Sequence, residues 1–454
     1  MQTDDLPETM LAPLLELARV LVEHARSHRD QPLADHEQAV LDAWRAAAPG
    51  VLAATVQQAT TGLDPTQRPV SATCTGCGQR RPVQSRRTRQ VQTRLGPLSL
   101  ERPWHHCAGC GHGWSPSDQA LHLQPHQRTS AGLQAWAARV AGLATFREAA
   151  SLLADLAGVD LGAETVRSHA ERLGATLELD QRATTAYVQQ HHEPPPGTEA
   201  PAPGTLLVEA DGVMVRYRDR PPTEAWHEVK LGLVGGWQDG QLHAPSYVAA
   251  REPARRCAER LVGEAARRGA LEVVGWRGSA RDGGGHEALL RPVVIVGDGA
   301  KWIWDEVAAS FGSERTEIVD WYHASEHLGT LATALFGEGT ARTQGWLDQA
   351  KHLLWRHGPT PLRELLLQAL PPTPAAQVLR RERGYFQTNA PRMHYPVFRR
   401  QGPPCGSGAV ESGAKHLVQL RMKRPGQRWS RPGAQAILTL RAHLLSDRPL
   451  PMGA

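Results

Sequence analysis

The sequence lacks long hydrophobic runs. No stretch of its 454 residues reaches the roughly 18 consecutive apolar residues that a membrane-spanning helix needs. The opening residues, MQTDDLPETM, also lack the basic and then apolar layout of a secretory signal. The hydrophobic fraction of 41% suits a globular protein with a sizeable core and about two to four domains. We therefore expect a cytoplasmic protein with no membrane partner.

Cysteine is also scarce, and its placement is uneven. In a cytoplasmic protein the six cysteines argue against a disulfide framework. Four of them form two C-x-G-C pairs, Cys74 with Cys77 and Cys107 with Cys110, and a further glycine follows each pair. Four thiolates in two such pairs suit a tetrahedral Zn²⁺ ion, and the glycines let the backbone turn its amides towards the sulfurs. The sequence therefore predicts a structural zinc site. Reduced cysteines without a metal are the alternative.

The segment between the two cysteine pairs is typical of a β-hairpin. Residues 91–106, VQTRLGPLSLERPWHH, place a turn glycine and proline between alternating segments. Two cysteine knuckles that are joined by strands make a zinc ribbon, which we predict over residues 67–126.

Acidic residues are nearly missing from two basic stretches. Residues 77–107 contain many arginines and the single acid Glu101, and residues 412–448 contain many lysines and arginines and the single acid Asp447. The net charge is only +5 because residues 1–40 are acidic. Segregated charge of this kind indicates a polyanion partner, with nucleic acid as the first candidate. Solvated faces that keep the protein soluble are the alternative.

Two regions have apolar residues at helical spacing. In the N-terminal region, residues 1–66, two helices are predicted as a packing or oligomerisation element, and no chemistry is assigned to them. Residues 127–190 read as helix, short glycine-containing turn and helix, which is typical of a helix-turn-helix. In that arrangement Arg167 and Arg172 would face the major groove of DNA. A plain helical bundle is the alternative.

A Pro-rich segment, residues 191–204, is predicted to be an extended linker. Residues 205–320 follow in the order three strands, helix, strand, helix and strand, which is the order of a ribonuclease-H-like core. Asp211 lies within the first strand, and Asp298 follows the fourth. Ligands of open α/β sheets bind at the carboxyl ends of the strands, so Asp298 marks a candidate site.

The last part of the chain is predicted to insert helices and then complete the core. Residues 321–400 read as helical and are too long for a loop, so we interpret them as a helical insertion. His323-x-x-Glu326-His327 within them is the inverse of a zinc-peptidase motif and would need a third ligand, so a helix N-terminus packed on the core is the preferred interpretation. Residues 401–454 complete the core, and Glu411 there begins a short helix in the basic stretch.

Asp211, Asp298 and Glu411 together suit a two-metal site. Phosphoryl transfer by two Mg²⁺ (or Mn²⁺) ions needs clustered carboxylates, and adjacent strands with a covering helix can supply them. Two rival acids exist, because Glu209 lies on the same strand and face as Asp211, and Asp320 follows the last strand. The alternatives are an exposed strand-end carboxylate for Asp298 and an ordinary helix-start acid for Glu411.

These motifs resemble the DDE transposases of bacterial insertion sequences, of the ISKra type, over about residues 70–445. The resemblance rests on V-E-A-D-G around Asp211, V-G-D-G-A-K-W-I-W around Asp298, D-W-Y-H-A-S-E-H-L from Asp320, and G-S-G-A-V-E-S-G-A-K around Glu411 with R-M-K-R-P-G-Q-R-W-S beyond it. It implies a multidomain α/β protein with a ribonuclease-H-like core, whose helical insertion precedes the third acid. It also implies a catalytic triad of Asp211, Asp298 and Glu411 on Mg²⁺.

The resemblance further implies binding of double-stranded DNA at terminal inverted repeats, hydrolysis at the element's end and transfer of the 3′-OH to target DNA. We expect a homodimer on DNA, located in the cytoplasm at the nucleoid, with no small-molecule substrate. The cations expected to follow phosphates in the basic C-terminal segment are Lys415, Arg421, Lys423, Arg424 and Arg428. An inactive DNA-binding protein derived from a transposase, or a stand-alone nuclease, would be the alternatives.

Overall fold

The computed structural model describes residues 8–60, 71–218, 221, 225–273, 288–290, 292–369 and 375–451. It divides into two compact units, Met1–Ala170 with Leu450–Ala454, and Glu171–Pro449. The mixture of helices and sheets confirms the predicted α/β class. None of the helices within the described ranges combines the length and the apolar character that crossing a bilayer requires.

The smaller unit begins with two helices in the predicted N-terminal helical region. α1 (Glu8–Ser27) and α2 (Leu33–Ala59) pack on each other. Among the described residues of this helix pair, Ala48 and Ala54 are the buried apolar side chains, whereas Leu15 and Leu33 are 66% and 74% exposed. The pair therefore buries little apolar surface of its own, and its oligomerisation role stays a prediction.

The predicted β-hairpin is confirmed. β3 (Ser85–Thr93) pairs antiparallel with β4 (Gly96–His106), and Thr93 lies opposite Gly96 across the turn. Gly96 has φ of 104°, a conformation that a residue with a side chain rarely adopts. Short elements lie on either side of the hairpin, namely β1 (Ala72–Thr73), β2 (Arg80–Arg81), β5 (Gly113–Trp114) and α3 (Pro116–Ala120).

The helical region predicted ahead of the Pro-rich segment is present as α4 (Ala131–Leu143), α5 (Phe146–Ala157) and α6 (Ala163–His191). The start of α5 is fixed by a capping box, in which Thr145 and Glu148 each bond the other's backbone N–H. Gly158 ends α5 at φ of 65°. The helix, turn and helix order is confirmed, and DNA binding by it stays a prediction. α6 runs across the division between the two units.

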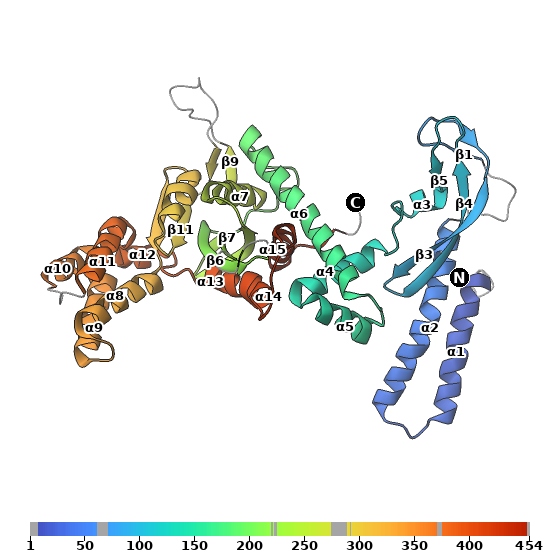
Figure 1. Cartoon of the computed structure of the whole chain (residues 1–454), viewed down its shortest axis with the longest axis horizontal. Coiled ribbons are helices and arrows are strands. Elements are labelled where there is room, and N and C mark those ends of the chain that lie inside the picture. Colours follow the sequence, from blue (N-terminus) through green and yellow to red (C-terminus); the bar gives the residue numbers. More distant parts are fainter. Residues whose placement is uncertain are drawn as a thin grey trace. The chain divides into compact units, whose positions relative to one another are not determined.

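The larger unit is built on a five-stranded sheet in the order β12-β11-β6-β7-β8 (Figure 1). β6, β7 and β8 are antiparallel neighbours, and β11 and β12 run parallel to β6. The predicted order of strands and helices is confirmed by these elements: β6 (Thr205–Arg216), β7 (Trp226–Gln238), β8 (Gln241–Ala250), α7 (Ala254–Arg267), β11 (Val293–Gly297), a π-helical and 3-10 stretch (Ile303–Val307 and Ala308–Phe311) and β12 (Arg315–Val319). A further pair, β9 (Leu271–Val273) and β10 (Ala288–Leu290), lies between α7 and β11.

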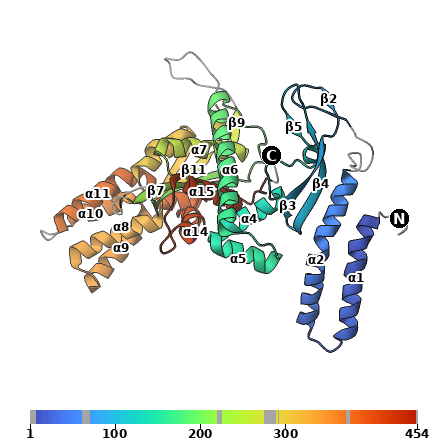
Figure 2. The same ribbon diagram turned by 45° about the vertical axis from the view of Figure 1, so that its right-hand side comes forward.

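The sheet is covered on both faces, as its sequence dictates. All five residues of β11 are buried, which is why this strand reads as a continuous apolar run. α7 packs on one face of the sheet (Figure 2). On β7, Gly232 lies against Leu261 of α7, where a side chain would clash. The neighbouring Leu231 points the other way and lies against Gly413, within the short helix that carries Glu411. Consecutive residues of one strand therefore hold helices on opposite faces.

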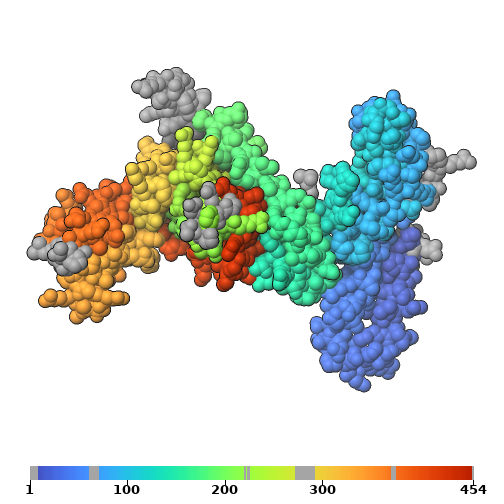
Figure 3. Space-filling view, viewed as in Figure 1, coloured from blue at the N-terminus to red at the C-terminus, as the bar shows by residue number. Residues whose placement is uncertain are grey.

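Helices occupy the chain between β12 and the last part of the unit, and they form a lobe beside the sheet (Figure 3). Trp321, Trp355 and Tyr395 come from three of these helices and stack together, with ring centroids 4.6 to 5.9 Å apart. The prediction of a helical region is confirmed, although the predicted break at Pro371–Pro374 lies outside the described residues. The helices are α8 (Trp321–Phe336), α9 (Ala341–His357), α10 (Pro359–Gln368), α11 (Ala376–Asn389), the 3-10 turn Ala390–Arg392 and α12 (Tyr395–Gln401).

The last elements pack back onto the same unit. They are α13 (Gly408–Gly413), a π-helical stretch (Ala414–Gln419), α14 (Leu420–Met422) and α15 (Arg431–Leu445). The Pro-rich segment predicted as a linker also lies inside this unit. Glu199 there pairs with Arg268 and, at 2.8 Å, with Arg448. The Pro-rich segment is therefore fastened to the α/β core, and the division of the chain falls earlier, within α6.

A buried ion-pair network joins the second half of α6 to this core. Arg260 of α7 is 4% exposed and contacts Glu178 of α6 (3.1 Å) and Glu252 (2.9 Å).

Arg260→Ala would leave Glu178 buried without its cation, and we expect a loss of about 3–5 kcal/mol in the free energy of unfolding. Urea unfolding measures this loss. Arg256→Ala, which removes an exposed ion pair, should cost about 1 kcal/mol or less. Equal losses in both variants would contradict the assignment.

Candidate functional site

Two of the predicted catalytic acids lie on neighbouring parallel strands. β11 pairs with β6 so that Gly297 lies opposite Ala210. The next residue after each is an aspartate, Asp298 or Asp211, so the register sets these two side by side where β11 ends. Both are half-buried. The backbone N–H of Ala300 donates to Asp298 Oδ1 (2.7 Å), which fixes that carboxylate at the start of the following helix.

The third predicted acid, Glu411, comes from α13, which covers the same sheet. Ser407, just before α13, donates its hydroxyl to Asp320 Oδ2 (2.7 Å), and the same hydroxyl lies 3.4 Å from Glu411 Oε1. One ligand atom from each of Asp320, His323 and Glu411 lies within 4.8 Å of the other two, so these residues could hold a metal ion. Glu411 is exposed, whereas Asp320 is buried.

The electrostatics connect the strand acids to this group. Burial raises the pKa of Asp211 above its ordinary value, and the negative charges of Asp298 and Glu411 raise it further. The three predicted acids therefore influence one another and lie near Asp320 and His323. We call these five residues the carboxylate cluster. The group whose ligand atoms lie within 4.8 Å of one another contains Glu411 but, among the described residues, neither Asp211 nor Asp298.

Glu209, the rival to Asp211, has a different place. It is 1% exposed, and its carboxyl accepts a hydrogen bond from the backbone N–H of Val410 (2.6 Å). Burial raises its pKa to about 8, so this carboxyl is largely neutral at pH 7. A buried neutral carboxyl that holds the start of α13 is a positioning group, which favours Asp211 as the metal-facing acid of β6.

His323, within the carboxylate cluster, and Ser407, which bonds Asp320, are the residues whose places here the sequence did not reveal. Asp320 N-caps α8 by accepting from His323 N (2.9 Å). Its carboxylate has a pKa lowered to about 2, because hydrogen bonds from His323 and Ser407 outweigh the effect of burial. A hydrogen bond with the neighbouring Asp320 raises the pKa of His323 to about 9. The sequence feature that could have indicated this pair is an aspartate that follows one strand and caps the next helix.

The His323-x-x-Glu326-His327 motif is a helix N-terminus, as preferred from the sequence. His327 lies 2.6 Å from Glu382 and stacks on Tyr385 at 3.7 Å between ring centroids. Among the described residues, the potential metal cluster at this place combines His323 with Asp320 and Glu411 and does not include His327. The peptidase-like pattern therefore does not form a site of its own.

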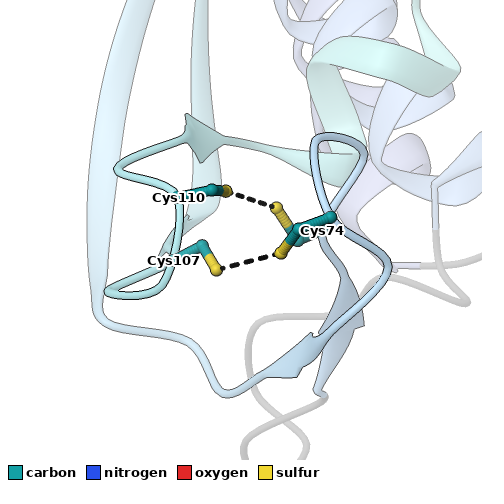
Figure 4. Close-up of side chains that lie close together, drawn as sticks. Cys74, Cys107 and Cys110 are labelled. Atoms are coloured by element: carbon teal, nitrogen blue, oxygen red, sulfur yellow. Dashed lines mark hydrogen bonds between the residues drawn. The ribbon is translucent and has the colours of Figure 1, made fainter.

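The four predicted zinc ligands do converge (Figure 4). Their four Sγ atoms all lie within 4.8 Å of one another, and the distances are 3.6 Å from Cys74 to Cys110 and 3.5 Å from Cys77 to Cys107. Tetrahedral zinc with Zn–S bonds near 2.3 Å needs sulfurs about 3.8 Å apart. The cluster therefore has the donor set and the spacing to bind zinc.

The two knuckles repeat the same backbone pattern. The N–H of Gly78 donates to Cys74 O (2.8 Å), and the N–H of Gly111 donates to Cys107 O (2.7 Å). Both glycines adopt φ above 70°, which favours a residue without a side chain. A hydrogen bond from Arg81 lowers the pKa of the Cys107 thiol to about 5. The thiolate form that zinc requires is therefore favoured at that ligand even before a metal binds.

Most of the predicted DNA-binding cations are at least partly exposed, and one is buried. Lys415, Lys423 and Arg428 are exposed, Arg172 is exposed on α6, and Arg424 is half-buried. Arg167 pairs with Glu164 one helical turn away. Arg421 is the correction, because it is 1% exposed and lies over the Trp429 ring at 5.0 Å. Its guanidinium packs the inside of the unit and does not face a phosphate backbone.

Comparison with known proteins gives one distant relative. No family model matches the chain. The UPF0236 protein in vanSb 3'region of Streptococcus gallolyticus is 24% identical over 366 residues, which cover 78% of this chain and 72% of that protein. Its name states no activity. The match is longer than the Glu171–Pro449 unit, so it includes residues of both units.

Zinc binding is tested by removing one ligand. We expect the wild-type chain to hold one Zn²⁺ and Cys107→Ser to lose it, because three ligands cannot close a structural site. Metal content by mass spectrometry measures this. Cys405→Ser is the matched control, since Cys405 lies outside the cluster, and it should keep its zinc. Zinc retained by Cys107→Ser would overturn the assignment.

Proposed function

We propose that the chain is a DDE transposase that cleaves and joins DNA at the ends of an insertion sequence. The observation that carries the proposal is the placement of Asp211 and Asp298 on neighbouring parallel strands, with Glu411 on a short helix that covers the same sheet, whose order is β12-β11-β6-β7-β8. Three antiparallel strands extended by two parallel ones is the order expected of a ribonuclease-H-like core. Acids from two adjacent parallel strands and from a covering helix suit phosphodiester chemistry on that core.

The donor set of the carboxylate cluster fits Mg²⁺ or Mn²⁺. These hard cations prefer carboxylate oxygens and keep several waters, and a half-buried edge open to solvent allows both. Asp211, Asp298 and Glu411 would hold the ions, and Asp320 would hold Ser407 and thereby the start of α13. When bound, the ions would activate the attacking oxygen and stabilise the leaving one.

The chain's own groups account for the placement of the substrate. The scissile phosphate would lie against the exposed Glu411 side of the cluster, because Asp298 and Asp211 are half-buried beneath it. Lys415, one helical turn beyond Glu411 and exposed, would neutralise a phosphate of the bound strand.

The zinc knuckles and the α4–α6 region would bind the terminal inverted repeats. Support comes from the basic character of residues 77–107 and from the confirmed helix, turn and helix order. The distant relative matches residues of both units, as expected of a protein that uses them together. Such an element works with paired ends, so a homodimer on DNA is proposed as well.

The catalytic assignment is tested by isosteric substitution. Glu411→Gln and Asp298→Asn should each reduce Mg²⁺-dependent strand cleavage by roughly 10³-fold or more, since the neutral amide is a poor ligand for a hard cation. Cleavage of a labelled duplex that carries the flanking inverted repeat measures this, and a mobility shift checks that end binding persists.

Glu314→Gln is the control for this test, because Glu314 is exposed and precedes β12, away from the cluster. It should cleave like the wild type. Normal cleavage by Glu411→Gln would contradict the proposal. DNA binding without cleavage by the wild-type chain would favour the inactive, transposase-derived alternative, and cleavage without strand transfer would favour the nuclease.

The basic C-terminal segment gives a separate prediction. Lys423→Ala and Arg428→Ala should each weaken binding to all duplex sequences alike and lower the slope of log affinity against log salt by about 1, because each exposed cation releases a counterion on contact. Arg421→Ala should leave that slope unchanged and lower the thermal stability, since its side chain is buried. Anisotropy titrations over a series of salt concentrations measure the slopes. A reduced slope for Arg421→Ala would contradict the correction.

A further inference from the structure

A cavity of about 1110 Å³ lies in the smaller unit beside the β3–β4 hairpin. One wall is the hairpin face that carries Arg87, Arg102 and Trp104, and the other is the segment from His112 to Arg128. We call it the ribbon cavity. Its volume is in the range of small-molecule and cofactor sites. Neither the zinc site nor the carboxylate cluster uses it.

The walls of the ribbon cavity carry an excess of positive charge. Asp118 is the acid that lines it, and its Oδ2 is already shared by Arg89 (2.9 Å) and Arg102 (2.6 Å). Arg87 and Arg128 line the cavity as well and are exposed. The remaining charge suits an anionic ligand such as a phosphate group.

The cavity also has a flat aromatic and guanidinium surface. Arg87 lies over the Trp104 ring at 4.3 Å, and Arg102 approaches the same ring at 5.4 Å. Cross-strand pairing sets this arrangement, because Arg87 lies opposite Arg102 in the hairpin. Unpaired bases stack on aromatic rings and on guanidinium planes, and such stacking tolerates any base.

Buried polar atoms along the cavity have no protein partner among the described residues. They are the Trp114 Nε1 and Ser115 Oγ donors and the Asp118 Oδ1 acceptor. Trp114 is 4% exposed and Ser115 is 2% exposed. Buried polar groups are nearly always hydrogen-bonded in folded proteins, and these atoms have almost no accessible surface, so ordered water inside the wall is the partner that fits them. The cavity's open surface for a ligand is therefore the one that Arg87, Arg128 and Trp104 form.

The wall opposite the hairpin is held in an unusual conformation. His122 and His126 have φ of 51° and 60°, which residues with side chains rarely adopt, although histidine is among the more tolerant. Arg89 fixes this segment by donating to Gln127 O (2.8 Å). Backbone in such conformations is characteristic of binding sites that are shaped before the ligand arrives.

We propose that the ribbon cavity binds an unpaired nucleotide of the DNA, with its base on the Arg87–Trp104 surface and its phosphate against the exposed arginines. The inference rests on the proposed function, which supplies the DNA, and adds that the end is held partly as a single strand. An internal base pair is excluded by geometry, because stacking within the duplex hides both faces of its bases. Residues of the zinc ribbon would then distinguish an opened or overhanging end from continuous duplex.

The test uses the full chain and fluorescein-labelled DNA of arbitrary sequence, read by anisotropy. The probes are a blunt duplex, the same duplex with an overhang of about 4 nucleotides, and a single strand. The wild type should bind the overhang and the single strand, and Arg87→Ala and Trp104→Ala should weaken both by about tenfold or more. Binding of the blunt duplex should change by less than about twofold, since one phosphate contact is a small part of it.

Arg86→Ala is the matched control. Arg86 precedes Arg87 on β3, so its side chain lies on the opposite face of the hairpin, where it pairs with Glu101. It should weaken single-strand binding by less than about twofold, as the loss of one exposed cation does. Zinc content confirms that each variant retains the folded ribbon.

Three outcomes overturn the proposal. In the first, the wild type does not bind the single strand. In the second, Arg87→Ala and Trp104→Ala bind the single strand normally. In the third, Arg86→Ala weakens single-strand binding as much as Arg87→Ala and Trp104→Ala do. The second outcome would mean that the Arg87–Trp104 surface does not contact the base. Failure of the transposase proposal appears separately, as absent cleavage of the inverted-repeat duplex.

Discussion

The parallel pairing of β11 with β6 is the constraint on which the candidate site depends. With Gly297 opposite Ala210, the aspartates that follow, Asp298 and Asp211, are neighbours. A shift of the register by one residue would turn every side chain of β11 to the other face and would separate the two acids. The register is secured by burial of all of β11, since both of its faces lie in the core. Hydrophobic packing therefore sets the distance between two charged groups that repel each other.

The third acid stands on a short helix that cannot position itself. α13 has six residues, too few to be stable alone, so it must be held from outside. Two buried carboxyls hold it: Glu209 accepts from Val410, and Asp320 accepts from Ser407. The structure thus divides five acids into two kinds. Glu209 and Asp320 fix the backbone, and Asp211, Asp298 and Glu411 are the acids that we propose to face a ligand.

The sequence was sufficient where the signal is local. The β-branched run of β11 and the C-x-G-C pairs gave the strand and the cysteine cluster correctly, because each depends on a few consecutive residues. The sequence was insufficient where two residues in contact are far apart in the chain. Glu209 and Asp211 share a strand and a face, and only a contact with Val410, 201 residues away, separates their roles. The sequence predicts His323 only as part of a helix N-terminus, and its place beside Glu411 could not be predicted because Glu411 lies on a distant helix.

Counting basic residues in the sequence also does not reveal which of them reach the surface. Residues 412–448 look uniformly basic, yet Arg421 lies buried over Trp429, and Arg441 is buried and donates to Leu417 O (2.6 Å). Arginine suits both uses, because its planar group stacks on rings and satisfies carbonyls as well as phosphates. The surface that can meet a polyanion is therefore smaller than the sequence indicates and is made by exposed cations such as Lys415 and Lys423. Since Lys415 follows Glu411 by one helical turn, that surface begins at the carboxylate cluster.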